Sequence, residues 1–255
     1  MKWIVQTNLQ TELNQYNNLV NALNKTNTEY QIVKTIPFTS ETIPEVNYKG
    51  DVFICGANSL KENKNYLNWN IGYIDNNLDY ELYNKYYSTF MLNYNSQINT
   101  IENIVFQYDK FFIRPTLDSK SFAGQIMTWE AFTNWREKLQ KISEVFSTLK
   151  LNDKVLISPL LDIKNEYRFW IVNSKIITYS SYKINKKFNV LEIVPKHVID
   201  FVEALLKIWV PNIAFCIDVC ELEDNSLKII ELNSINSSGF YNANLNKLVE
   251  AINSI

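Results

Sequence analysis

Two carboxylates and one carboxamide near the end of the chain have the types and spacing of a metal site. Asp224 and Asn225 separate two runs rich in Ile, Val, Leu, Phe and Cys, which predicts a hairpin with a two-residue turn. In that hairpin Asp218 lies directly opposite Glu231, with Cβ atoms about 5 Å apart. Asn233 shares their face because side chains alternate along a strand. Three hard oxygen ligands are typical of Mg²⁺, so we predict a magnesium site at Asp218, Glu231 and Asn233.

The two opposed carboxylates also predict an electrostatic strain. Like charges directly opposite each other destabilise a sheet, and no cation is evident on this face of the hairpin. We therefore expect a strained pair in the metal-free protein, which Asp218→Asn or Glu231→Gln relieves by about 0.5–1 kcal/mol. The alternative is a solvent-facing surface on which both carboxylates pair with nearby lysines as structural ion pairs.

Four cations at the ends of predicted strands or in a nearby loop form a second group. They are Arg114, Lys120, Arg168 and Lys183. Arginine offers a planar fork to phosphate or carboxylate, whereas lysine offers a point charge. Each one alone is more often a surface side chain whose aliphatic part packs on the protein. Beside a magnesium site they together predict a polyphosphate-binding site, although the loop 118–124 lacks the spacing and ending of a Walker A motif.

The first third of the chain predicts a small α/β unit. Strands are expected at 2–6, 30–36 and 51–55, and helices at 12–24 and 79–92. This alternation favours a mainly parallel sheet. The segment 93–103 is rich in asparagine and loses periodicity, so we place a domain boundary near it and expect domains at 1–100 and 101–255.

The remainder of the chain predicts an α+β domain. Asn173 and Ser174 form a hairpin signal between two of its strands. Further elements follow from hydrophobic periodicity and from turn residues. The expected strands are 155–161, 167–172, 175–182, 214–220 and 227–232, and the expected helices are 128–148, one that Pro195 opens, and one after Tyr241.

Composition limits the function classes. The 255 residues are 46% hydrophobic and 20% charged, which is ordinary for a globular protein. His197 is the only histidine, which excludes His-cluster metal sites and leaves little room for a Ser/His/Asp triad. A net charge of −2 provides no global field that recruits nucleic acid or an anionic membrane. The three cysteines lie mostly in apolar runs, and no run resembles a signal peptide or membrane span, so we expect a cytoplasmic protein with free thiols.

The run Ile230-Glu231-Leu232-Asn233, preceded by a strand that carries Asp218, resembles the metal-binding strands of the ATP-grasp superfamily. Other runs resemble a bacterial and viral branch of it, in which arginine replaces the usual first-lobe strand lysine. These runs are 112–115, 118–124, 166–169 and 236–241, together with 3–8 and 53–56, which resemble its pre-ATP-grasp domain. The resemblance implies an α/β N-terminal pre-ATP-grasp domain followed by an α+β two-lobed ATP-grasp domain, with lobes at about 101–155 and 156–255.

The resemblance further implies an ATP- and Mg²⁺-dependent ligase that joins a carboxylate to an amine, or another nucleophile, through an acyl phosphate. Its substrates would be small-molecule or peptide carboxylates and amines. Asp218, Glu231 and Asn233 would hold Mg²⁺. The implied nucleotide contacts are Arg114 and Lys120 on phosphates, Glu166 beside them, and the strand with Ser158 and Leu160 on adenine. The implied catalytic residues are Arg168, facing the γ-phosphate or the acyl-phosphate oxygens, and Lys183 nearby. Phosphoryl transfer depends mainly on positioning and charge neutralisation, so the scarcity of histidine fits this activity.

Two other classes of function compete with a ligase. A non-catalytic nucleotide-binding or adaptor module keeps such a fold without turnover, although retention of all the candidate ligands and cations speaks against decay. A nucleic-acid-binding protein would stack bases on its aromatic residues, but the acidic balance and the helical spacing of most aromatics favour core packing instead. Tyr241 and the loop 237–239 are candidates for contact with the acceptor, or form a plain turn.

Overall fold

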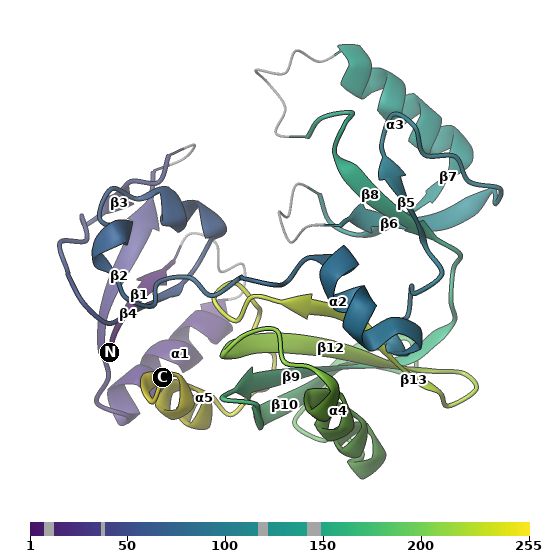
Figure 1. Ribbon diagram of the computed structural model, residues 1–255. Coiled ribbons are helices and arrows are strands. Elements are labelled where there is room, and N and C mark those ends of the chain that lie inside the picture. The colour runs from purple at the N-terminus through teal and green to yellow at the C-terminus, as the bar shows by residue number, and fades with distance from the viewer. Residues whose placement is uncertain (8–12, 37–38, 117–121, 142–148) are drawn as a thin grey trace.

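Three sheets organise the chain in the computed structural model, which describes residues 1–7, 13–36, 39–116, 122–141 and 149–255. Figure 1 shows the N-terminal unit on the left, beside a five-stranded sheet, and a small four-stranded lobe at the upper right, above that sheet. The four-stranded sheet within residues 97–158, with the helix over 129–141, is called the first lobe. The five-stranded sheet within residues 163–233, with the helices over 196–208 and 245–253, is called the second lobe.

The N-terminal unit confirms the predicted parallel α/β arrangement. Strand β1 (Lys2–Gln6) is parallel to β2 (Glu29–Thr35) on one side and to β4 (Val52–Cys55) on the other, and α1 (Leu13–Lys25) connects β1 to β2. A fourth strand, β3 (Thr42–Ile43), pairs antiparallel with β2 and has only two residues, too few to produce a periodic signal. Short 3₁₀ turns follow at Asn58–Glu62 and Tyr66–Asn68.

Helix α2 (Tyr80–Tyr87) follows this unit and is shorter than the predicted 79–92. Asp79 begins it, because its side chain accepts a hydrogen bond from the backbone N–H of Leu82. It ends where Ser88 adopts a positive φ of 45°, and a 3₁₀ turn continues over Ser88–Phe90. Its buried tyrosines join the core of the second lobe.

The first lobe is an antiparallel sheet in the order β5-β8-β6-β7. Its strands are β5 (Gln97–Thr100), β6 (Lys110–Pro115), β7 (Gln125–Thr128) and β8 (Lys154–Ser158), and α3 (Trp129–Lys141) packs against it. Strands β5 and β7 were not expected, because both are short and neither carries a fully buried side chain. The last part of the predicted 128–148 helix, residues 142–148, lies outside the described residues.

The second lobe contains the expected hairpins in one antiparallel sheet, ordered β11-β10-β9-β12-β13. Asn173 and Ser174 both have positive φ, 49° and 60°, which confirms the predicted two-residue turn between β9 and β10. The bounds are β9 (Ile163–Val172), β10 (Lys175–Ile184), β11 (Lys187–Leu191), β12 (Ala214–Leu222), β13 (Leu227–Asn233), α4 (Lys196–Ile208) and α5 (Leu245–Asn253).

The two faces of this sheet have different surroundings. Tyr167, Phe169 and Ile171 of β9 lie in a core with α4 and α2, whereas Trp170 lies in a second core with α1 and α5. Helices α1 and α5 cover only one end of that second face. At the other end, Glu166, Arg168 and Asp218 line a cleft instead of a core. Strand alternation therefore directs these three polar side chains to one open surface.

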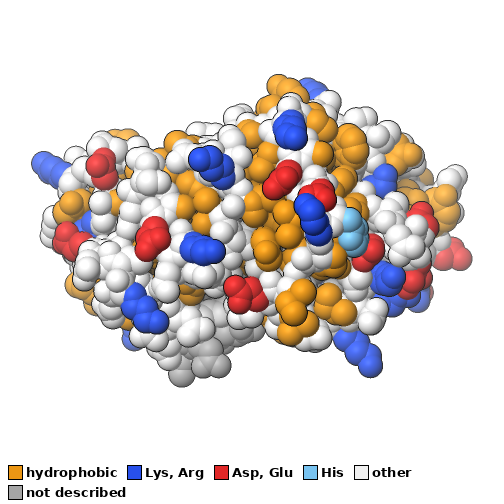
Figure 2. Space-filling view, turned by 90° about the horizontal axis from the view of Figure 1, so that it is seen from below, with side chains coloured by type: hydrophobic (Ala, Val, Ile, Leu, Met, Phe, Trp, Pro, Cys, Tyr) orange, Lys and Arg blue, Asp and Glu red, His pale blue; other side chains and the backbone are white. Residues whose placement is uncertain are grey.

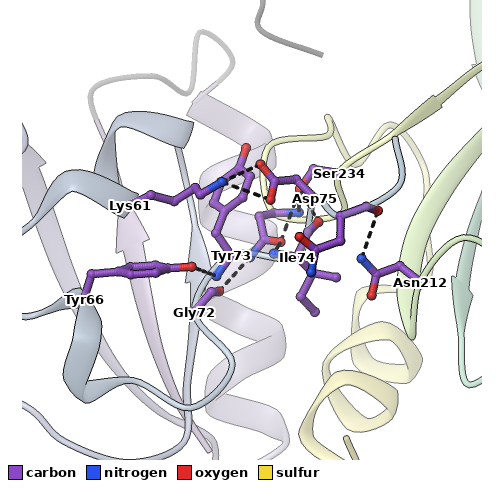
Figure 3. Close-up of polar contacts among 10 residues, drawn as sticks. Lys61, Tyr66, Gly72, Tyr73, Ile74, Asp75, Asn212 and Ser234 are labelled. Atoms are coloured by element: carbon purple, nitrogen blue, oxygen red, sulfur yellow. Dashed lines mark hydrogen bonds and ion pairs between the residues drawn. The ribbon is translucent and has the colours of Figure 1, made fainter. Parts of the chain in front are cut away.

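A buried asparagine, Asn236, connects the loop after β13 to the N-terminal unit. The Asn236 amide nitrogen donates to the carbonyls of Ile54 and Gly72, at 2.6 and 3.1 Å, and its side-chain oxygen accepts from the Ile74 N–H at 2.8 Å. Ser234 adds a hydrogen bond to the Ile74 carbonyl at 2.9 Å, and Figure 3 shows these two residues side by side. These bonds fix the end of β13 relative to the N-terminal unit.

The surface carries mixed charge. Figure 2 shows positive and negative side chains alternating among hydrophobic ones over the face seen from below. Within the described part of the chain, no helix has the length and apolar character needed to cross a membrane.

Candidate functional site

The β12–β13 hairpin places Asp218 directly opposite Glu231, as predicted. The length of the loop and the regularity of the strand pairing differ from the prediction. The loop spans residues 223–225 instead of two residues, because Leu222 pairs with Ser226. A β-bulge between Asp218 and Val219 then restores the expected register, since Val219 pairs with Ile229 and Ile230 is the extra residue. The bulge directs Ile230 and Glu231 toward the cleft, while Ile229 and Leu232 remain in the core.

Arg168 forms a buried ion pair with Asp218. The two residues are direct partners on β9 and β12, and Arg168 Nε and Nη2 lie 2.7 and 2.6 Å from the two carboxylate oxygens. Their side chains are 9% and 2% exposed. The expectation of a carboxylate pair without a cation is therefore wrong, because strand β9 supplies one. The alternative of surface pairing with lysines is also wrong for these two carboxylates, since their cationic partners are arginines.

Glu231 binds an arginine from the other lobe. Arg114 Nη1, at the end of β6, lies 2.9 Å from Glu231 Oε2. Asn233 Nδ2 lies 2.9 Å from Glu231 Oε1 and 3.3 Å from Asp218 Oδ2, so the three predicted metal ligands meet at one point. One network of charges thus links both lobes.

Burial controls the ionisation of this network. It raises the pKa of the Asp218 carboxyl above its usual value; Arg168 opposes this rise, and Glu231 and Glu166 add to it. Burial disfavours the charged guanidinium of Arg168, yet Asp218 holds its pKa well above the usual value. Burial and the nearby carboxylates also raise the pKa of Tyr182, so its phenol stays protonated at neutral pH.

The network forms part of the wall of a cleft of about 1060 Å³ between the two lobes. Of the predicted site residues, eight line it: Arg114, Leu160, Glu166, Arg168, Lys183, Asp218, Glu231 and Asn233. Lys183 on β10 donates to Glu166 on β9 at 2.6 Å. The Ser158 side chain is buried and donates to Asn93 Oδ1 at 2.9 Å, and it is Asn93 that lines the cleft. Lys120 lies outside the described residues.

Sequence reasoning missed the role of Tyr182 in the cleft wall. Its ring stacks on Tyr241, with centroids 4.7 Å apart and an interplanar angle of 9°, and the Arg168 guanidinium lies 5.0 Å from the Tyr241 centroid. Tyr241 has a positive φ of 45°, which is uncommon for an aromatic residue. Asn93 and Lys186 were also missed. Neither has a distinctive sequence context, because asparagine and lysine are abundant throughout the chain.

The donor set fits a hard divalent cation. Within the described residues, no three His, Cys, Asp or Glu side chains cluster as a metal site. Asp218, Glu231 and Asn233 instead combine two carboxylates with one amide, and oxygen donors of this kind suit Mg²⁺ when phosphate oxygens complete the shell. The Asn233 amide faces both carboxylates with Nδ2, so it would turn over to present Oδ1 to a cation. Both carboxylates already have an arginine partner, so a cation would share these oxygens with Arg168 and Arg114 or displace them.

The fold is shared with solved structures of low sequence identity. D-cycloserine synthetase DcsG superposes with a TM-score of 0.60 at 10% identity, covering 100% of this chain and 99% of that chain. D-alanine–D-alanine ligase from Bacillus anthracis, complexed with ATP, gives 0.60 at 13%, covering 100% and 96%. A RimK domain ATP-grasp protein from Sphaerobacter thermophilus gives 0.59 at 8%, covering 93% and 92%.

At the level of sequence, a comparison with curated proteins finds no match. A family model described as ATP-grasp domain, R2K clade family 3, matches residues 60–252, which is more than half of the chain. The chain therefore belongs to family 3 of the R2K clade of ATP-grasp domains.

Proposed function

We propose that the protein is an ATP- and Mg²⁺-dependent ligase that joins a carboxylate to an amine or another nucleophile through an acyl phosphate. The observation that carries this proposal is the convergence of Arg114, Arg168 and Lys183, from both lobes, beside Asp218 and Glu231 in one cleft. The structural likeness to D-alanine–D-alanine ligase and D-cycloserine synthetase supports it.

The proposed binding roles follow the position of each residue in the cleft. Asp218, Glu231 and Asn233 hold Mg²⁺, which when bound neutralises charge on the phosphate oxygens. Arg114 contacts the phosphates from the first lobe, together with Lys120, while Glu166 and Lys183 lie at the second-lobe side. The strand end around Ser158 and Leu160 contacts adenine through its backbone. The N-terminal unit acts as the pre-ATP-grasp domain of the family.

The proposed catalytic role of Arg168 follows from its bonding. Nε and Nη2 bind Asp218, and Nη1 lies 3.3 Å from the Gly239 carbonyl, so Nη1 is the nitrogen positioned for a second anionic partner. A substrate carboxylate oxygen takes the γ-phosphoryl group and ADP leaves; the nucleophile then attacks the acyl carbon and phosphate leaves. The protein contributes mainly positioning and charge neutralisation.

The test separates binding from turnover. Calorimetry with a non-hydrolysable ATP analogue and Mg²⁺ should show binding that EDTA abolishes, and Mg²⁺–ATP should raise the melting temperature by mass action. ADP release should then appear with one member of a panel of carboxylates and amines, with the product identified by mass spectrometry, and Glu231→Gln should remove it. Nucleotide binding without ADP release on any pair favours the adaptor alternative, and no binding of ATP or GTP contradicts both.

A further inference from the structure

Both carboxylates of the proposed metal site have hydrogen-bond donors from the protein on each of their oxygens. The two oxygens of Asp218 accept from Arg168 Nε and Nη2, at 2.7 and 2.6 Å. Glu231 Oε1 accepts from Asn233 Nδ2 at 2.9 Å, and Oε2 lies 2.9 Å from Arg114 Nη1. A guanidinium beside a carboxylate repels a second cation. A metal ion therefore binds these oxygens most favourably where an arginine moves away.

Of the two arginines, Arg168 is the fixed one. It lies on β9, in the same sheet as Asp218, and its side chain is buried. Each of its three guanidinium nitrogens contacts a protein oxygen, two on Asp218 and one on the Gly239 carbonyl. Its departure would leave the buried Asp218 carboxylate without a counter-charge, which is strongly unfavourable. We therefore expect Arg168 to stay in place when a ligand enters the cleft.

Arg114 is held differently, because it reaches Glu231 from another lobe. Arg114 lies near the end of β6 in the first lobe, whereas Glu231 lies on β13 in the second. Among the ion pairs between described residues, theirs is the one that joins the two lobes. Arg114 Nε donates to the Pro115 carbonyl at 3.2 Å, so only part of the guanidinium faces Glu231. The Glu231 side chain is 30% exposed, so release of Arg114 leaves a carboxylate that water or a cation can reach.

We propose that Arg114 is an exchangeable counter-ion: it neutralises Glu231 while no nucleotide is bound, and it moves to the phosphates when Mg²⁺–nucleotide binds, which leaves Glu231 to the cation. This rests on the proposed function, because it takes Glu231 as a metal ligand and Arg114 as a phosphate contact. A cation alone offers Arg114 no new partner, so the exchange disfavours metal binding without nucleotide. It thereby couples metal binding, nucleotide binding and the contact between the lobes.

Mn²⁺ binding to the full chain without nucleotide, measured from the electron paramagnetic resonance signal of the free ion, tests the exchange. Mn²⁺ is a suitable probe because it favours the same octahedral oxygen coordination as Mg²⁺. Arg114→Ala should bind Mn²⁺ about five- to tenfold more tightly than the parent, because Glu231 then lacks its competing cation. The same variant should bind a Mg²⁺–ATP analogue about tenfold more weakly. Opposite signs are the signature, since a merely structural loss would weaken both.

Two controls locate the effect at Glu231. Lys186→Ala removes a cleft cation that pairs with Asp162 and Glu223 instead, and it should change Mn²⁺ affinity by less than about twofold. In a Glu231→Gln background, Arg114→Ala should not tighten Mn²⁺ binding, because the carboxylate for which arginine and metal compete is absent. Melting temperatures confirm that each variant is folded.

Equal Mn²⁺ affinity in the parent and in Arg114→Ala overturns the proposal, as does an absence of Mn²⁺ binding in both. A comparable gain in Lys186→Ala, or a gain that persists in the Glu231→Gln background, also overturns it, since net charge would then be the cause. Failure of the proposed function is distinguishable. The expected Mn²⁺ results with nucleotide binding but no ADP release would refute the ligase and leave the exchange standing. ADP release with unchanged Mn²⁺ affinity in Arg114→Ala would refute the exchange alone.

Discussion

Arg168 binds both carboxylate oxygens of Asp218 across the β9–β12 pairing, at 2.7 and 2.6 Å. Asp218 also faces Glu231 on its other side, and Glu231 in turn binds Arg114. A row of four charges, with the two carboxylates between the two arginines, therefore crosses three neighbouring strands of the second lobe and reaches the first lobe. The consequence is that Asp218 contributes to folding as well as to the proposed metal site.

Asp218→Asn should destabilise the metal-free protein by about 3 kcal/mol, because it leaves Arg168 buried without its counter-charge. This loss of stability is opposite in sign to the gain of about 0.5–1 kcal/mol that relief of the Asp218–Glu231 repulsion alone would give. Glu231→Gln is the matched comparison: the Glu231 side chain is 30% exposed, so the loss should be about 1 kcal/mol or less. Urea unfolding in EDTA measures both, and an Asp218→Asn protein as stable as the parent would contradict the structural role of the pair.

Arg114→Ala should weaken the binding of a Mg²⁺–ATP analogue by about tenfold, because it removes a charged donor at the first-lobe side of the cleft. Arg136→Ala is the matched control, since that arginine packs on Trp129 and Phe132 of α3 and does not line the cleft. Calorimetry measures both affinities. Equal affinities in the two variants would show that the phosphates bind elsewhere.

Ile229→Ala and Ile230→Ala should have different effects although the residues are adjacent. Ile229 is fully buried in the core, so its truncation should cost about 2–5 kcal/mol of stability. Ile230 lines the cleft because of the bulge, so its truncation should affect nucleotide affinity more than stability. Unfolding curves and calorimetry on the two variants test the bulge, and a comparable loss of stability in both would argue against it.

Asn236→Ala should destabilise the junction between the N-terminal unit and the loop after β13. The substitution removes the amide that binds the Ile54 and Gly72 carbonyls and the Ile74 N–H. Each of these buried groups that stays without a hydrogen-bond partner should lower the free energy of unfolding by about 1–3 kcal/mol. Asn18→Ala, on the exposed side of α1, should change stability by less than about 0.5 kcal/mol. Thermal and urea unfolding compare the two, and equal stabilities would mean that water replaces the lost bonds.

The protein should lose stability at alkaline pH. Burial raises the pKa of the Cys55 and Cys220 thiols to about 12, and burial with the Glu221 charge raises the pKa of Tyr167 to about 12. Between the ordinary pKa values, about 8.5 for Cys and 10 for Tyr, and pH 12 the unfolded chain releases protons that the folded chain retains. Each group should therefore subtract up to roughly 1.4 kcal/mol per pH unit in that window.

Urea unfolding between pH 8 and pH 11 measures this slope, and a flat profile would contradict the burial of these groups. The same burial predicts that a thiol reagent at pH 8 labels the three cysteines only after unfolding. Rapid labelling of the folded protein would contradict it.

Local elements could be predicted because their signals lie within a few residues. The β9–β10 turn, the amphipathic helix α4 and the parallel strands of the N-terminal unit follow from turn chemistry and periodicity. The predicted opposition of Asp218 and Glu231 was also correct. The loop is one residue longer than predicted, which shifts the strand pairing, and the bulge at Ile230 shifts the pairing back. Strands β5, β7 and β11 were missed because they are short and partly exposed, so backbone pairing with neighbours defines them more than any hydrophobic pattern.

The residue types of the candidate site, including its proposed metal ligands and most of its cations, were determined by the sequence itself. Which cation faces which carboxylate was decided only by the tertiary structure. Arg168 meets Asp218 because β9 pairs with β12 in one particular register, and Arg114 meets Glu231 because the first lobe packs over the second. Such registers depend on the combined packing of strands far apart in the chain, which local periodicity does not specify.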